Sequence, residues 1–85
     1  MMVEKKLREL ATMVGTHVPA HAVQDYLTFV EANEAELGLG ILCDFLSDEE
    51  ESLTSEEVEL IRELTDALGL PARYIEVVEE LRTAP

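Results

Sequence analysis

Apolar residues recur at intervals of three and four along the whole chain, as they do on one face of an amphipathic helix. The first such stripe consists of Val3, Leu7, Leu10, Ala11 and Val14. Gly15 follows the stripe directly, and glycine commonly ends a helix in the left-handed conformation. We therefore expect a helix over residues 2–14 that ends at Gly15.

A second stripe predicts a helix over residues 19–32, with Pro19 in its first turn, where a missing N–H costs nothing. Its apolar positions are Val23, Tyr26, Leu27 and Val30. Asn33 then interrupts the pattern.

A third helix follows, with apolar residues on one side. These are Leu37, Ile41, Leu42, Phe45 and Leu46. Gly38 and Gly40 lie inside this helix, where each glycine costs about 1 kcal/mol relative to alanine. We expect the two glycines to allow close packing against another helix.

Residues 47–53 are acidic and poor in apolar residues, which is typical of a loop. Thr54 and Glu57 then have the spacing of a capping box, in which Thr54 caps a fourth helix and Glu57 bonds back to its amide. The inner face of that helix is expected at Val58, Ile61, Leu64, Thr65 and Leu68. Gly69 ends it, and Pro71 opens a fifth helix. The apolar positions of the fifth helix are Tyr74, Val77, Val78 and Leu81.

Strands are not expected, because no alternating run of β-branched residues exceeds three. Five helices joined by short links favour antiparallel neighbours. The 85 residues suit one domain. The sequence therefore predicts an all-α fold, a compact antiparallel bundle of about five short helices in a single domain over residues 1–85.

The net charge is −13, and nearly all of the excess lies in the middle of the chain. Residues 16–60 hold twelve carboxylates and no lysine or arginine. A field of this sign repels nucleic acid and anionic membranes and attracts cationic partners. We therefore expect a basic protein partner and no direct binding to nucleic acid or membranes.

The expected compartment is the cytoplasm. No apolar run approaches the length that spans a bilayer, and the first residues lack the pattern of a signal peptide. Cys43 is the only cysteine, so no internal disulfide can form, and it is expected to be a small apolar residue.

No combination of residues favours catalysis, a metal or a cofactor. His17 and His21 are four apart, but Pro19 lies between them and no further ligand completes a site, so both are expected to be ordinary surface histidines. No Cys-His or Ser-His-Asp arrangement can be assembled. We therefore expect neither an enzyme nor a bound cofactor.

An acidic run, Asp48, Glu49, Glu50 and Glu51, is the densest charge in the chain. It lacks the alternating ligands and central glycine of a calcium loop. Two interpretations stay open, a solvated loop or an anionic binding patch that also includes Asp44, Glu56, Glu57 and Glu59. Phe29 lies off the stripe of its helix, and it is either an edge of the core or an exposed anchor for a partner.

The segment from Phe29 to Leu46, FVEANEAELGLGILCDFL, resembles the Maf-type small immunity proteins that bacteria encode beside secreted polymorphic toxins. The resemblance covers about residues 23–70. It rests on a helix that ends near an acidic pair, a leucine-rich helix that closes on Leu-Cys-Asp-x-Leu, and an acidic loop before two shorter helices. Gly38 and Gly40 depart from the family pattern, where alanine or glutamate is expected.

The resemblance implies a cytoplasmic protein that binds and neutralises its cognate toxin. Many such toxins are nucleases, and an acidic partner matches a cationic substrate cleft. The expected toxin-binding residues are Glu31, Glu34, Glu36, Asp44, Asp48, Glu49, Glu50 and Glu51.

Two other functions fit the sequence. Glu51-Ser52-Leu53 is similar to the Asp-Ser-Leu prosthetic-arm site of acyl and peptidyl carrier proteins, although glutamate replaces aspartate and the capping box already explains a helix start here. A regulatory adaptor that binds another basic protein is the third possibility.

Overall fold

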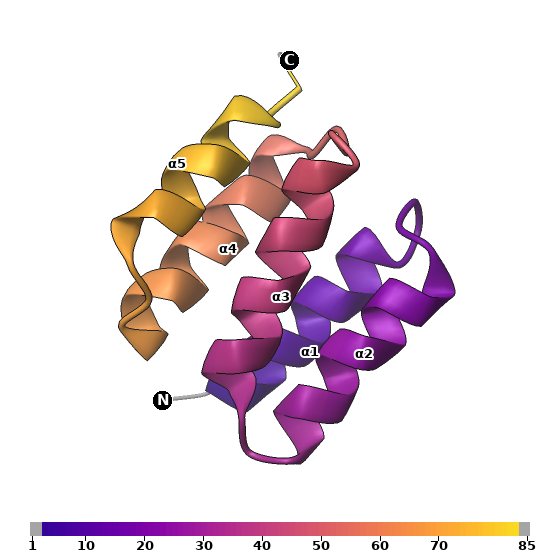
Figure 1. Ribbon diagram of the computed structural model, residues 1–85, viewed down its shortest axis with the longest axis vertical. Coiled ribbons are helices and arrows are strands. Elements are labelled where there is room, and N and C mark those ends of the chain that lie inside the picture. Colours follow the sequence, from indigo (N-terminus) through magenta and orange to yellow (C-terminus); the bar gives the residue numbers. More distant parts are fainter. Residues whose placement is uncertain (1–2, 84–85) are drawn as a thin grey trace.

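The computed structural model describes residues 3–83 of the chain, which form five α-helices. They are α1 (Val3–Val14), α2 (Ala20–Glu31), α3 (Ala35–Asp48), α4 (Ser55–Leu68) and α5 (Ala72–Glu80). Consecutive helices run in alternating directions, and α3 crosses the front of the molecule between α2 and α5, with α1 and α4 behind it (Figure 1). The predicted all-α antiparallel bundle is confirmed.

The hydrophobic stripes of α1, α2 and α4 form one continuous core with the inner face of α3. Tyr26 is fully buried at its centre, and its hydroxyl donates a hydrogen bond to the carbonyl oxygen of Leu7 at 2.8 Å. This bond satisfies the polar end of a side chain that otherwise packs among leucines, as buried polar groups require. Burial also raises the pKa of Tyr26, so its hydroxyl stays protonated.

The capping box at the start of α4 is confirmed. The hydroxyl of Thr54 accepts from the amide of Glu57 at 3.1 Å, and the Glu57 carboxylate accepts from the amide of Thr54 at 2.9 Å. Gly69 ends α4 in the left-handed conformation, with φ 72°, as the sequence predicts. The loop before α4 is held by the end of α5, because the amide of Thr83 donates to the carbonyl of Leu53 at 2.7 Å.

The two glycines of α3 lie in contact with neighbouring helices, as predicted. A Cβ atom at Gly38 would lie 2.7 Å from Cβ of Phe29 on α2, and one at Gly40 would lie 3.2 Å from the hydroxyl of Tyr74 on α5. Phe29 is half-buried, and its Cβ faces Gly38 where α2 and α3 meet. The glycines therefore let α2 and α5 approach α3 from its two sides.

The prediction for the inner side of α3 is wrong at Leu37 and Ile41. Their exposed fractions are 52% and 39%, whereas the buried positions of the helix are Leu39, Leu42, Cys43 and Leu46. At about 100° per residue, these buried positions centre on the side opposite Leu37 and Ile41. The prediction is confirmed at Leu42 and Leu46. The continuous apolar run from Leu37 to Cys43 is compatible with more than one buried face, and packing selects the face that contains Leu39 and Cys43.

Smaller differences concern the helix ends. Residue 2, the predicted start of the first helix, lies outside the described residues. Gly15 is not left-handed, because after α1 the chain makes another helical turn in which the amide of Val18 donates to the carbonyl of Val14 at 2.7 Å. Pro19 stands just before α2 rather than in its first turn.

The boundary between α3 and the acidic loop also differs. The loop was expected from residue 47, but Ser47 and Asp48 belong to α3. The helix ends at Asp48, and Glu50, two residues further on, takes a left-handed conformation with φ 49°. Asn33, at the predicted break between α2 and α3, is likewise left-handed with φ 64°, a conformation that asparagine adopts more easily than most residues.

Candidate functional site

Four exposed residues form a single stripe along the solvent side of α3, and we call this stripe the α3 outer face. It consists of Leu37, Ile41, Asp44 and Asp48. Their spacing of four, three and four places them on one side of the helix, about opposite the residues that α3 buries. The solvent side of α3, the helix that lies in front in Figure 1, therefore has an apolar half and an acidic half.

Further predicted binding residues lie at the two ends of the same helix. Glu34 directly precedes α3 and Glu36 is in its first turn, whereas Glu49 and Glu50 directly follow it. All four side chains are exposed. With Asp44 and Asp48, six of the eight predicted residues thus belong to α3 or to the residues at its ends.

The acids at the C-terminal end of α3 oppose the helix dipole. Backbone carbonyls make that end of a helix partly negative, so cations stabilise it and anions do not. The last turn of α3 carries no basic residue, and Asp48, Glu49 and Glu50 add three carboxylates there. This placement concentrates negative potential and does not stabilise the fold.

The remaining two predicted residues have partners within the chain. Glu31 lies 3.7 Å from Arg8 on α1. Glu51 is half-buried, and its carboxylate lies 3.0 Å from Nδ1 of His17. The predicted contact of these two residues with a toxin stays a prediction, although both carboxylates already have an internal partner.

His17 has a structural role that the sequence analysis missed. Its Nε2 lies 2.8 Å from Oε2 of Glu57, a side chain with only 3% exposure, while Nδ1 meets Glu51. Hydrogen bonds to Glu51 and then Glu57 raise the pKa of His17 above its ordinary value of 6.5. No local pattern could have revealed this contact, because residues 17, 51 and 57 meet only when the α1–α2 link packs on the start of α4.

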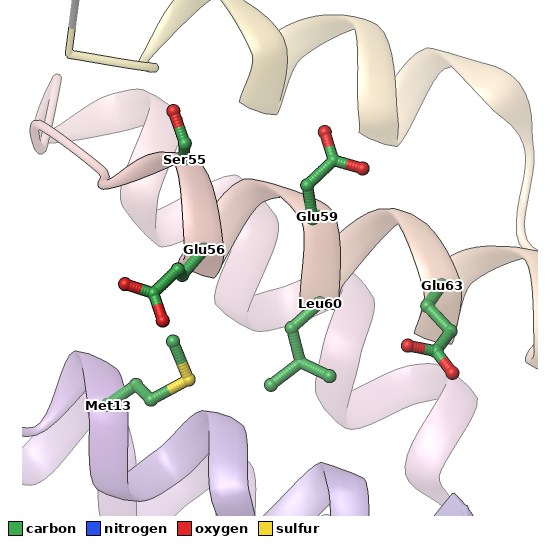
Figure 2. Close-up of a pocket in the computed structure, with 6 residues that line it drawn as sticks. All are labelled: Met13, Ser55, Glu56, Glu59, Leu60 and Glu63. Atoms are coloured by element: carbon green, nitrogen blue, oxygen red, sulfur yellow. The ribbon is translucent and has the colours of Figure 1, made fainter. Parts of the chain in front are cut away.

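A groove of about 430 Å³ lies between α1 and α4 and is lined by Met13, Ser55, Glu56, Glu59, Leu60 and Glu63. Figure 2 shows Met13, Glu56 and Leu60 pointing into it, whereas Glu59 points towards α5. Glu59 accepts from Arg82 at 2.8 Å, and Glu63 is paired with Lys6. Two of the three carboxylates of the groove are therefore engaged by cations.

The residues around the groove include no cysteine or histidine. Cys43 is buried, and burial raises the pKa of its thiol to about 12, so it is not a thiolate at neutral pH. Between residues 3 and 83 there is no group of three or more histidine, cysteine or acidic side chains that could hold a metal ion.

Ser52, the residue that the carrier alternative would modify, lies in the loop between α3 and α4. It is exposed, but it stands two residues before the N-cap of α4, between the half-buried Glu51 and the fully buried Leu53.

None of the helices between residues 3 and 83 has the length and apolar character needed to span a bilayer.

Comparisons of the chain with models of known protein families, with curated proteins and with solved structures give no match.

Proposed function

We propose that this protein is an immunity protein, which binds a basic toxin domain through the α3 outer face and the acids at both ends of α3. The observation that carries the proposal is the placement of six exposed carboxylates on or beside one helix. A helix packed on its neighbours holds these charges in fixed positions, so they need not be ordered when the partner arrives.

The charge arrangement suits a fast-binding inhibitor. Negative charge concentrated at one face steers a cationic partner towards that face and raises the association rate. The acids at the C-terminal end of α3 act together with the helix dipole, so the potential there is stronger than the side chains alone would give. A basic nuclease cleft, built to hold phosphates, is complementary to such a surface.

The identity of the partner comes from the resemblance to Maf-type immunity proteins. On this basis the toxin is encoded beside this chain, the complex forms in the bacterial cytoplasm, and the toxin is a nuclease. The protein acts by binding and needs no cofactor. A regulatory adaptor would use the same acidic surface for a different basic protein.

Co-expression with the neighbouring open reading frame tests this proposal. We expect the neighbour to be toxic alone, harmless together with this protein, and recoverable with it in a stoichiometric complex. A variant in which Asp44, Asp48, Glu49 and Glu50 become their amides should be folded but protect poorly. A neighbour that is harmless alone, or that kills cells containing abundant folded protein, would contradict the proposal. An intact mass that shows phosphopantetheine on Ser52 would favour the carrier alternative.

A further inference from the structure

We propose that Leu37 and Ile41 are the apolar centre of the binding surface, and that the partner carries an apolar patch bordered by lysine or arginine on both sides. The inference rests on the proposed function and specifies the contact that holds the complex together. It changes the role of the carboxylates, which become the charged borders of an interface whose centre is apolar.

Exposure is the first observation behind the inference. Among residues 3–83, Leu37 and Ile41 are the large hydrophobic side chains that stand exposed, with 52% and 39% of their surface accessible. They are one helical turn apart on the same side of α3, so they form a single patch. Phe45 continues the patch towards α2, where its half-buried ring meets the edge of the His21 ring at 5.9 Å between centroids.

The fold gives no reason for this patch. The buried residues that hold α3 in the bundle are on the side of the helix opposite Leu37 and Ile41. On the two flanks of α3, Gly38 contacts α2 and Gly40 contacts α5. A polar residue at position 37 or 41 would serve the bundle equally well. Exposed apolar side chains that adjoin on one face and are bordered by polar residues are a feature of protein interaction sites.

Charge decides which partner covers the patch. Asp44 and Asp48 continue the same stripe on one side, and Glu34 and Glu36 lie on the other. A second copy of this chain would bring these carboxylates against their own symmetry mates, because a symmetric dimer uses the same surface twice. A surface with lysine or arginine around an apolar patch is complementary to both features at once.

The stripe also fixes the shape of the partner surface. Leu37 and Asp48 are eleven residues apart on one helix, which corresponds to roughly 16 Å along its axis. The exposed acids of α3 precede Leu37 on one side and follow Ile41 on the other, so negative charge flanks the apolar pair along the helix. Arg73, which donates to the hydroxyl of Tyr74 at 2.9 Å, adds a positive charge at the α5 border. The partner should therefore present basic residues at both ends of an apolar strip, as in interfaces with an apolar core and a polar rim.

The test measures binding of the purified product of the neighbouring gene to the parent and to Leu37→Ser/Ile41→Ser. The exposed positions leave folding intact, which a matching denaturation midpoint would verify. We expect the affinity to fall by roughly 100-fold, mainly through faster dissociation, with the association rate within about threefold of the parent. The matched control Leu37→Met/Ile41→Leu keeps the apolar area, and its affinity should stay within about threefold of the parent.

Each outcome separates this inference from the proposed function. If the parent binds and protects but the serine variant binds equally well, the apolar centre is wrong and the immunity function stands. If the parent neither binds the neighbouring product nor protects cells from it, the proposed function fails and the inference fails with it. If sedimentation shows a dimer of the parent that the serine variant abolishes, the patch is covered by a second copy, which also overturns the inference.

Discussion

The imidazole of His17 lies between two carboxylates, with Nε2 2.8 Å from Oε2 of Glu57 and Nδ1 3.0 Å from Oε1 of Glu51. The other oxygen of Glu57 accepts from the amide of Thr54, so one buried carboxylate serves both the cap of α4 and the α1–α2 link. A protonated histidine donates from both ring nitrogens, and it therefore fits this position better than the neutral ring does.

The stability supplied by His17 should decrease as the pH rises. Because the pKa of His17 is raised in the folded chain above its ordinary value of 6.5, its bonds to the carboxylates contribute fully below about pH 6.5. The contribution is lost as the pH rises through the raised folded value. Chemical denaturation of the parent and of His17→Gln checks this, since the variant lacks the titrating group. A difference in unfolding free energy that grows with pH would contradict the expectation.

Thr54→Ala should destabilise the protein by about 1 kcal/mol, since the amide of Glu57 loses its acceptor in the first turn of α4. Ser52→Ala is the matched control, because it removes a hydroxyl from an exposed position in the same loop. We expect the urea midpoint to fall for the first variant and to stay within error for the second. Equal midpoints for all three proteins would show that the cap contributes nothing.

The ends of a helix could be predicted where particular residue types mark them. Thr54 with Glu57 marks the start of α4, and Gly69 marks its end, because each residue supplies a bond or a conformation that others do not. The end of α3 could not be predicted in this way, since a glutamate such as Glu50 rarely takes the left-handed conformation. Here that conformation accompanies a local hydrogen bond from the amide of Glu51 to the carbonyl of Leu46 at 3.0 Å. Gly15 does not end the helical path of the chain, because the residues after it form one more helical turn.

The two glycines of α3 should respond differently to alanine. At Gly38 the new Cβ would lie 2.7 Å from Cβ of Phe29 and 3.2 Å from the carbonyl oxygen of Tyr26, so a backbone atom resists the change. At Gly40 the nearest atom is the hydroxyl end of Tyr74 at 3.2 Å, which can move. We expect Gly38→Ala to destabilise by about 1–3 kcal/mol. Gly40→Ala should be within about 1 kcal/mol of the parent, because the better helix propensity of alanine offsets the contact. Thermal melts of both variants check the order, and a more stable Gly38→Ala would contradict it.

The candidate site was predictable in its charge but not in its apolar part. Most carboxylates lie at the surface, so the exposure of Asp44, Asp48 and Glu49 could be predicted from the sequence, although Glu51 of the same run is half-buried. Leu37 and Ile41 lie in a run of apolar residues in which only packing decides which side is buried. The contacts of His17 with Glu51 and Glu57 could not be predicted either, because the two partners come from distant parts of the chain.

Moderate salt should raise the melting temperature. Several cations of the chain form surface ion pairs, such as Lys6 with Glu63 and Arg82 with Glu59, and exposed pairs contribute only about 0–1 kcal/mol each. The acids at the C-terminal end of α3 have the opposite effect, because they repel one another and the helix dipole. Screening over about 8–10 Å weakens this repulsion. Melts at increasing sodium chloride check the sign, and a steady fall from low to moderate salt would refute it.

The acids that follow the apolar patch should control how fast the partner binds. The variant Asp48→Asn/Glu49→Gln/Glu50→Gln changes the net charge from −13 to −10 and removes the concentration of charge at the end of α3. Glu51 is left unchanged because it holds His17. The control Asp66→Asn/Glu76→Gln/Glu80→Gln has the same net charge, and its exposed positions lie on α4 and α5. Steering depends on where the charge lies, so we expect the α3 variant to associate about tenfold more slowly and with a weaker salt dependence, and the control to stay close to the parent. Stopped-flow association with the neighbouring gene product at several salt concentrations measures both effects. If the two variants slow equally, net charge alone attracts the partner, and the acidic end of α3 has no special role.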